Sequence, residues 1–414
     1  MKDRASRTYD VIVWGATGFT GRLVAEHLLE TYGTDGSVRW AIAGRSRTKL
    51  EEVRRSLGAR ASRLELLYAD ASDAKSLGAL AGQTRVVCTT VGPYAEHGSL
   101  LVASCVEQGT DYCDLCGEPL WMQQMIDQHH EAARQSGARI VTSCGFDSIP
   151  SDCGVAFLDA HAKQRFGQPC ARIALRVERL HGELSGGTIA SLFSMLAEAR
   201  RNPSAAAVLR DPYALNPAGE RSGPDRADLS GVAFDEQLGA WLAPFMMAGV
   251  NTRVVRRSNA LLGYPYGKDF RYEEALLIGK GAAARIKATA TALALGAFVA
   301  SATLTPGLVR RWLPRPGQGP SRAKRESGSF SCLLVGEQSH GAVLKARVTG
   351  NRDPGYGATS RMLGESAVCL AQDVGAATPG GLLTPASAMQ QQLVPRLIEK
   401  AGLAFELVSE QASS

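Results

Sequence analysis

The glycine-rich turn near the N-terminus constrains the fold of this chain more than any other feature. Asp10–Trp14 is a short apolar run rich in β-branched residues, and Gly15, Gly18 and Gly21 follow it directly. The next stretch, Arg22–Thr31, has apolar residues at helical spacing. A strand, a tight turn and a helix in this order bring a phosphate close to free backbone N–H groups and the positive end of the helix dipole. A purely structural turn is the alternative, but this context favours a dinucleotide site.

Strand-like and helix-like patterns alternate through the rest of the first 150 residues. Predicted strands are Val38–Gly44, Leu64–Ala69, Val86–Val91, Asp111–Asp114 and Arg139–Ser143; predicted helices are Thr48–Leu57, Leu100–Gln108 and Leu120–Ser136. This rhythm is typical of a parallel, doubly wound sheet. We therefore expect an α/β protein with a Rossmann domain over residues 1–150.

The pattern changes after Pro150. Predicted strands are Ala171–Leu180, Asp269–Ile278, Ser329–Val335 and Ala342–Thr349; predicted helices are Thr188–Arg200, Gly357–Ala371 and Ala386–Ala401. Asn202–Pro244 is rich in Pro, Gly, Asp and Arg and predicts loops with short helices, and Pro314–Ser329 predicts an exposed connection. These patterns predict a second α/β domain with a mixed or antiparallel sheet.

The end of the second predicted strand indicates which dinucleotide binds. An NAD site usually has an acid there for the ribose 2′-hydroxyl, whereas this chain has Arg45 and Ser46, which suit a 2′-phosphate. We predict NADP, with a solvated basic face as the alternative. Asp70, after the third strand, is a candidate for the adenine side or a helix cap. The predicted cofactor-binding residues are Gly15, Thr17, Gly18, Phe19, Gly21, Arg45, Ser46, Asp70, Gly92 and Pro93.

The cysteines and the N-terminus indicate a reducing compartment. There are 9 Cys, an odd number spread through apolar runs, and Met1–Tyr9 carries no apolar signal region. Cys113 and Cys116 form an isolated C-x-x-C at a strand end, without a second pair or paired histidines. We therefore expect a cytoplasmic protein without a metal site.

A long uncharged segment, Ala288–Val309, lies in a basic region. Nine of the 46 basic residues fall between Ala275 and Arg325 without one acid, so the rest of the chain is faintly acidic although the net charge is +6. The length suits a membrane span, but alanine and threonine dominate and Gly296 and Pro306 interrupt it. We interpret it first as a buried or interface-packed helix, with a membrane-surface contact and a true span as alternatives. The basic flanks suit an anionic membrane or an acidic carrier protein.

The motifs, taken together, resemble a known superfamily. The matching runs are Trp14–Gly21, Ala43–Ser46, Thr90–Tyr94, Gly109–Glu118, Cys144–Asp152, Gly186–Thr188, Asn251–Asn259, Gly355–Tyr356 and Leu383–Ala388. In this order they resemble the saccharopine-dehydrogenase-like oxidoreductases, and most closely the trans-acting enoyl reductases of bacterial lipid biosynthesis. One departure is Cys116, where the family has threonine in a D-L-T-G-E run.

The resemblance implies a domain plan. It places an NADP-binding Rossmann domain at 1–150 and a substrate and dimerisation domain at 151–355, which includes the basic-flanked apolar segment 282–312. Helices in 356–414 are expected to pack back on the first domain. A homodimer and a peripheral membrane contact through 282–312, at the inner face of the plasma membrane, are further expectations, and no nucleic-acid partner is expected.

The resemblance also implies a reaction. Trans-acting enoyl reductases reduce a carbon–carbon double bond in an acyl or polyketide thioester held on a carrier protein, in phthiocerol and glycolipid pathways. The superfamily keeps two alternatives open. One is a saccharopine-dehydrogenase-like C–N oxidoreductase, and the other is a catalytically idle NADP-binding protein at a lipid surface.

Three side chains near the predicted strand ends are candidates for catalysis. Tyr94 has a phenol that can donate to an enolate, or its ring packs on the nicotinamide. Glu118 can hold the carboxamide or a substrate group, or it is an acid at a helix N-terminus. Asp147 can bind substrate or cap the helix that follows Pro150.

Overall fold

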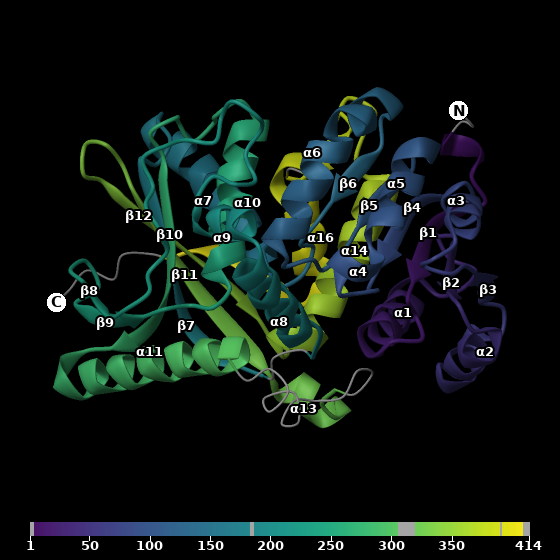
Figure 1. The fold of residues 1–414 in the computed structure, drawn as a ribbon, viewed down its shortest axis with the longest axis horizontal. Coiled ribbons are helices and arrows are strands. Elements are labelled where there is room, and N and C mark those ends of the chain that lie inside the picture. The colour runs from purple at the N-terminus through teal and green to yellow at the C-terminus, as the bar shows by residue number, and fades with distance from the viewer. Residues whose placement is uncertain (1–3, 183–185, 305–318, 390, 409–414) are drawn as a thin grey trace.

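The two halves of the molecule are each built on one sheet. The computed structural model describes residues 4–182, 186–304, 319–389 and 391–408. In these residues the chain forms two seven-stranded sheets with helices packed on them, and Figure 1 shows the N-terminal sheet on the right and the second sheet on the left. The expected α/β class with two sheet domains is confirmed.

The first sheet is wholly parallel, in the order β13-β6-β5-β4-β1-β2-β3. Its strands are β1 Tyr9–Trp14, β2 Trp40–Gly44, β3 Glu65–Tyr68, β4 Thr84–Thr89, β5 Asp111–Cys113, β6 Arg139–Val141 and β13 Gly381–Leu383. The helices of this half are α1 Phe19–Tyr32, α2 Arg47–Ser56, α3 Ala74–Ala81, α4 Tyr94–His97, α5 Ser99–Gln108 and α6 Pro119–Ser136, with short 3-10 turns at Arg4–Ser6 and Ala59–Ala61.

The strand order reverses beside β1, and this sets the position of the ligand crevice. β1 pairs with β2 on one side and with β4 on the other, so the helices after β1 and β4 leave in opposite directions. Ligands of open parallel sheets bind at the carboxyl ends of the strands on either side of such a switch point. β1 reads as a continuous apolar run because both faces of a parallel sheet are covered.

The second sheet is mixed, in the order β14-β12-β11-β7-β10-β9-β8, and only its β7–β10 pair is parallel. Its strands are β7 Arg172–His181, β8 Ala233–Asp235, β9 Ala240–Ala243, β10 Arg271–Gly279, β11 Ser329–Glu337, β12 Val343–Gly350 and β14 Leu403–Leu407. The helices of this half are α7 Ile149–Phe166, α8 Gly186–Arg201, α9 Pro203–Arg210, α10 Ala248–Leu261, α11 Gly281–Leu304 and α13 Arg322–Ser327.

The C-terminal segment joins the two halves. Helix α14, Thr359–Gln372, packs against α1, β1, β4 and β5 of the first half. The segment also supplies strands, which the sequence pattern did not indicate: β13 extends the first sheet and β14 pairs with β12 of the second. The helix expected over Ala386–Ala401 is interrupted, because Pro395 lacks the N–H that a helix interior needs. It is replaced by α15 Pro385–Met389, α16 Leu393–Arg396 and a π turn at Leu397–Ala401; another π turn, Pro354–Ala358, precedes α14.

Helix α11 is apolar and yet exposed. It lies against β9, β10 and α8, and Figure 1 shows it along the outside of the second half. The side chains of Ile286, Leu293 and Leu304 are 72%, 69% and 71% exposed. The expectation of a helix buried within the chain is therefore wrong for this part. By length and composition α11 could cross a membrane. Residues 305–318, which hold the end of the uncharged segment and part of the expected connection, lie outside the described residues.

Candidate active site

The glycine turn is built so tightly that side chains are excluded from it. Gly15 has φ +90°, a conformation that favours glycine, and a Cβ on Gly21 would lie 2.3 Å from the Gly15 carbonyl oxygen. Gly18 is the N-cap of α1 and provides no side-chain cap. The first N–H groups of α1 are therefore left for a ligand, as a pyrophosphate requires. This geometry fits a dinucleotide.

The neighbouring strand ends supply the nucleotide side. Arg45 follows β2 and is exposed, and Ser46 caps α2 by accepting a bond from the Lys49 N–H, which leaves its hydroxyl proton free to donate. Asp70 follows β3, where its carboxylate accepts bonds from Ser72. These bonds, together with the Arg45 guanidinium, lower the pKa of Asp70. The actual N-cap of α3 is Asp73.

The remaining predicted cofactor residues surround the same turn. Phe19 begins α1, and its ring makes an edge contact with Tyr356, with centroids 4.9 Å apart, while the Arg325 guanidinium lies over the Phe19 ring. Thr17 faces Gly44 at the end of β2. Gly92 lines a cavity beside the turn, and Pro93 is the N-cap of α4.

A large, mostly apolar cavity opens where the strand ends of the first half meet the second half. Its volume is about 860 Å³, which is the size of a ligand pocket. Its walls come from the loops after β4, β5 and β6, from α8, from the start of α10 and from the inner face of α11. The apolar wall residues include Leu115, Phe146, Leu192, Met195, Leu196, Phe245, Met246, Met247, Val250, Leu295 and Phe298.

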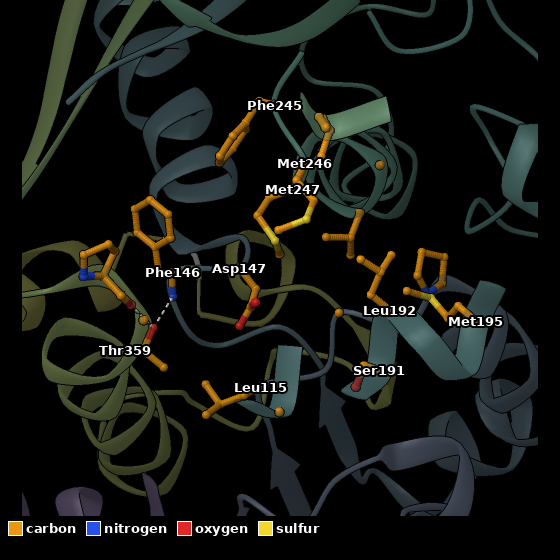
Figure 2. Close-up of a pocket in the computed structure, with 18 of the residues that line it drawn as sticks. Leu115, Phe146, Asp147, Ser191, Leu192, Met195, Phe245, Met246, Met247 and Thr359 are labelled. Carbon is orange, nitrogen blue, oxygen red and sulfur yellow. Dashed lines mark hydrogen bonds between the residues drawn. The ribbon is translucent and has the colours of Figure 1, made fainter. Parts of the chain in front are cut away.

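Asp147 is directed into this cavity. Figure 2 shows its carboxylate in the open space between Met247, Leu115 and Ser191. Desolvation raises the pKa of Asp147 to about 7, although its own backbone N–H opposes the shift. The N-cap of α7 is Ser148, so Asp147 is not needed as a helix cap. A carboxyl that titrates near neutral pH beside an apolar ligand is suited to proton transfer.

Tyr94 lines the cavity but its hydroxyl is used within the protein. The Leu115 N–H donates to the phenol oxygen at 3.1 Å, and the phenol lies 3.5 Å from the Thr89 carbonyl oxygen. Burial raises the pKa of Tyr94 well above its ordinary value. Trp121 packs beside the ring at 5.6 Å. The ring therefore forms a wall, and its hydroxyl holds two strand-end loops together.

Glu118 holds the start of α4. Its two carboxylate oxygens accept the backbone N–H groups of Tyr94 and Ala95, each at 2.9 Å, and Ser191 of α8 donates to it at 2.6 Å. This is the alternative that the sequence left open, an acid at a helix N-terminus. The bond to α8 could not be predicted from the sequence, because Ser191 lies 73 positions away.

The structure brings some predicted residues together and adds others. Asp147, Tyr94 and Gly92 share the cavity with the turn residue Thr20. The walls from α8 and α11 were missed, since apolar helix faces carry no motif. Cys116, the departure from the family pattern, is buried, and its sulfur accepts the Glu118 N–H at 3.4 Å. Among the described residues, no group of three or more His, Cys, Asp or Glu could hold a metal ion.

Comparisons with known proteins agree with this geometry. Residues 11–141 match the family model of the saccharopine dehydrogenase NADP binding domain. A Mycobacterium tuberculosis protein named provisionally as a trans-acting enoyl reductase is 42% identical over 403 residues, which cover 94% of this chain and 96% of that protein. The chain belongs to the trans-acting enoyl reductase family.

A second relative supports the same assignment, and a solved structure supports the fold. A trans-acting enoyl reductase of Mycobacterium bovis is 39% identical over 406 residues, covering 95% of this chain and 96% of that protein. Saccharopine dehydrogenase from Saccharomyces cerevisiae shares the fold, with a TM-score of 0.51 at 12% identity over 97% of this chain and 100% of that chain. With its NADP-binding domain, this family member is an NADP-dependent oxidoreductase.

Proposed function

We propose that this protein reduces the carbon–carbon double bond of an α,β-unsaturated acyl thioester with NADPH. The observation that carries the proposal is the apolar cavity, which extends from the strand ends beside the glycine turn and contains Asp147. An acyl chain fits these walls, and they keep water from the reacting carbons. The names of the relatives, trans-acting enoyl reductases, support the same chemistry.

The roles of the residues follow from their positions. NADPH, when bound, supplies a hydride to the β-carbon of the substrate. The glycine turn holds the pyrophosphate, and Arg45 with Ser46 selects the 2′-phosphate. Asp147 holds the proton that is delivered to the α-carbon. Tyr94 and Glu118 shape the wall and fix the loops, because their polar atoms are already bonded within the protein.

The acyl chain is proposed to come from a partner synthase and to serve lipid biosynthesis, including glycolipids. A thioester carried on the flexible arm of a carrier protein can reach a cavity with an open mouth. The composition of α11 supports a cytoplasmic location at the anionic inner face of the membrane. Lys280, Arg285 and Lys287 lie at the start of this helix, and its outer side is apolar. If α11 is covered by a second copy of the chain instead, the protein will dimerise and will not float with vesicles.

The activity is tested with purified protein, NADPH and 2-enoyl thioesters of increasing chain length. We expect substrate-dependent loss of NADPH absorbance, greater efficiency with long chains than with short ones, and slower turnover with NADH. Imines and amino acids serve as the comparison substrates. Turnover of those compounds with no reaction of any enoyl thioester would overturn the proposal in favour of C–N chemistry. Tight NADPH binding with no turnover at all would point to an idle binding protein.

A further inference from the structure

A row of buried polar side chains runs behind the cavity wall from the Asp147 turn to β10. The Ser148 hydroxyl donates to the Asn251 amide oxygen at 3.1 Å, and the Asn251 amide nitrogen donates to Glu274 at 2.8 Å. The other Glu274 oxygen accepts the Tyr272 hydroxyl at 2.7 Å. The row thus connects the start of α7, α10 and β10.

Ser148, the first residue of the row, does not cap its helix in the way that an N-cap serine usually does. Ser148 is the N-cap of α7, where a serine oxygen ordinarily accepts an N–H of the first helical turn, but it makes no such cap here. Its hydroxyl donates sideways to Asn251 instead. The cap that this helix forgoes is replaced by a link to the second half of the molecule.

Burial makes the row rigid. Ser148, Asn251, Glu274 and Tyr272 are 0%, 1%, 2% and 1% exposed. Polar groups at this depth must keep their partners, and removing one member leaves the others unsatisfied. The amide of Asn251 has one orientation that serves both neighbours, since Ser148 needs an acceptor and Glu274 needs a donor.

Asp147 lies between two anchors on different elements. On one side the Phe146 N–H donates to the Thr359 hydroxyl at 2.9 Å, a bond that Figure 2 shows as a dashed line. On the other side Ser148 is bonded to Asn251. Because both neighbours in the chain are tied, the backbone that carries Asp147 is held by α10 and by the C-terminal segment.

We propose that Asn251 and Glu274 are positioning residues, which act through Ser148 to aim Asp147 at the reacting carbon. The inference rests on the proposed function of Asp147 in enoyl reduction. Neither residue touches the substrate: Glu274 holds the Asn251 amide, and Asn251 holds the serine. Misplacement of a reacting group by about 1 Å can cost about 10²-fold in rate, so loosening this row lowers kcat.

The first test is a double-mutant cycle with a matched control. We expect Asn251→Ala to lower kcat by about 10²-fold with little change in NADPH affinity. Asn259→Ala is the control. Asn259 is a buried residue of the same helix and also makes two bonds, one to the Gly267 carbonyl oxygen and one from the Tyr266 N–H, so its loss should cost similar stability while kcat is kept. In an Asp147→Asn background, Asn251→Ala should have almost no further effect. If the kcat losses of the two substitutions multiply in the double variant, the proposal is overturned.

The second test does not require turnover of an enoyl substrate. Carbon-13 labelling of the aspartate carboxyls reports the pKa of Asp147, which interacts electrostatically with Tyr94 and Cys116. In folded Asn251→Ala we expect this pKa to fall toward the ordinary value as water reaches the turn, and in Asn259→Ala to stay as in wild type. An unchanged pKa in folded Asn251→Ala would refute the positioning role. An inactive wild type with the expected pKa change would refute only the proposed reaction.

Discussion

Helices α10 and α11 both flank the second sheet, and their burial is the reverse of what their composition suggests. Helix α10 carries Arg253, Arg256 and Arg257, and all three are buried. Helix α11 has no charged residue from Ala288 to its end at Leu304, and most of its residues are exposed. The difference shows that the availability of hydrogen-bond partners, and not hydropathy, decides which of the two helices is buried.

The arginines of α10 are buried because fixed carbonyl oxygens meet them. Arg256 donates to the Pro212 and Tyr272 carbonyl oxygens and to Asp225. Arg257 donates to the carbonyl oxygens of Leu215 and Leu382. The guanidinium groups therefore satisfy loop carbonyls that would otherwise be buried without partners. In this way α10 ties the irregular segment before it to the sheet and to β13.

Three threonines of helix α11 bond their hydroxyls within the helix. The hydroxyls of Thr289, Thr291 and Thr303 each donate to the carbonyl oxygen four residues earlier. The outer surface of α11 therefore has few polar groups that need a partner from outside the helix, as in helices that contact lipid. Its inner face, with Leu295 and Phe298, forms part of the apolar cavity wall, while Asp147 enters the cavity from the loop between β6 and α7, beside Met247 at the start of α10.

The largest effect is expected on the α10 side of the cavity. Asp147→Asn should lower kcat by about 10²–10⁴-fold, because the amide cannot give up a proton. A general acid works in its protonated form, so wild-type kcat should fall as the pH rises above about 7, and this fall should be absent in the variant. Rates measured from pH 5.5 to 9, about the range around this pKa, check both effects. An unchanged pH profile in Asp147→Asn would assign the proton to another group.

The next effect concerns folding stability. Arg257→Met should lower the free energy of unfolding by about 3–5 kcal/mol, since two buried carbonyl oxygens lose their donor. Arg285→Met on α11 is the matched control; its exposed guanidinium lies over Trp241, and its loss should cost about 1 kcal/mol or less. Urea unfolding measures both variants. If the two variants lose similar amounts of unfolding free energy, the buried arginine of α10 contributes no more to stability than the exposed arginine of α11.

A smaller effect is expected on the outer face of α11. Leu293→Glu should weaken binding to anionic vesicles by about 10–100-fold. This range corresponds to the free energy of transferring one leucine side chain from water into lipid. Unfolding and NADPH binding should not change, because the side chain is exposed. Vesicle flotation measures the binding, with Tyr68→Glu on the exposed edge strand β3 as a surface control. Equal flotation of both variants and wild type would exclude a lipid contact at this face.

The smallest effect is expected on the inner face of the same helix. Leu295→Trp fills part of the cavity and should raise KM about 10-fold for long enoyl chains, while short chains are unaffected. A series of thioesters of increasing length gives the comparison. A uniform change for all lengths would mean that the chain does not extend toward α11.

The first half of the fold could be predicted from the sequence because its signals are local. The glycine turn, the apolar strands and the helices between them each lie within a few residues, and Arg45 at a strand end indicated NADP. Strand β13 could not be predicted, since three residues join a sheet whose other strands end 240 positions earlier. The burial of α10 was missed because its carbonyl partners come from distant loops.

The positions of the candidate residues could be predicted from the sequence more readily than their contacts. Tyr94, Glu118 and Asp147 all follow strands of one parallel sheet, and Tyr94 and Asp147 line the cavity. Which of the three has a carboxyl or phenol facing the cavity depends on tertiary bonds. Glu118 is occupied by α4 and α8, and Tyr94 by the neighbouring loops, so Asp147 alone of these three keeps its polar atoms directed into the cavity.

The most direct measurement of the proposed reaction traces the two hydrogens. The enzyme is given an enoyl thioester and NADPH that carries deuterium at the transferred position, in ordinary water, and the product is analysed by mass spectrometry and NMR. The proposal predicts one deuterium at the β-carbon and a solvent-derived hydrogen at the α-carbon, with the rate lost in Asp147→Asn. A product without deuterium at the β-carbon, or an Asp147→Asn variant as fast as wild type, would contradict it.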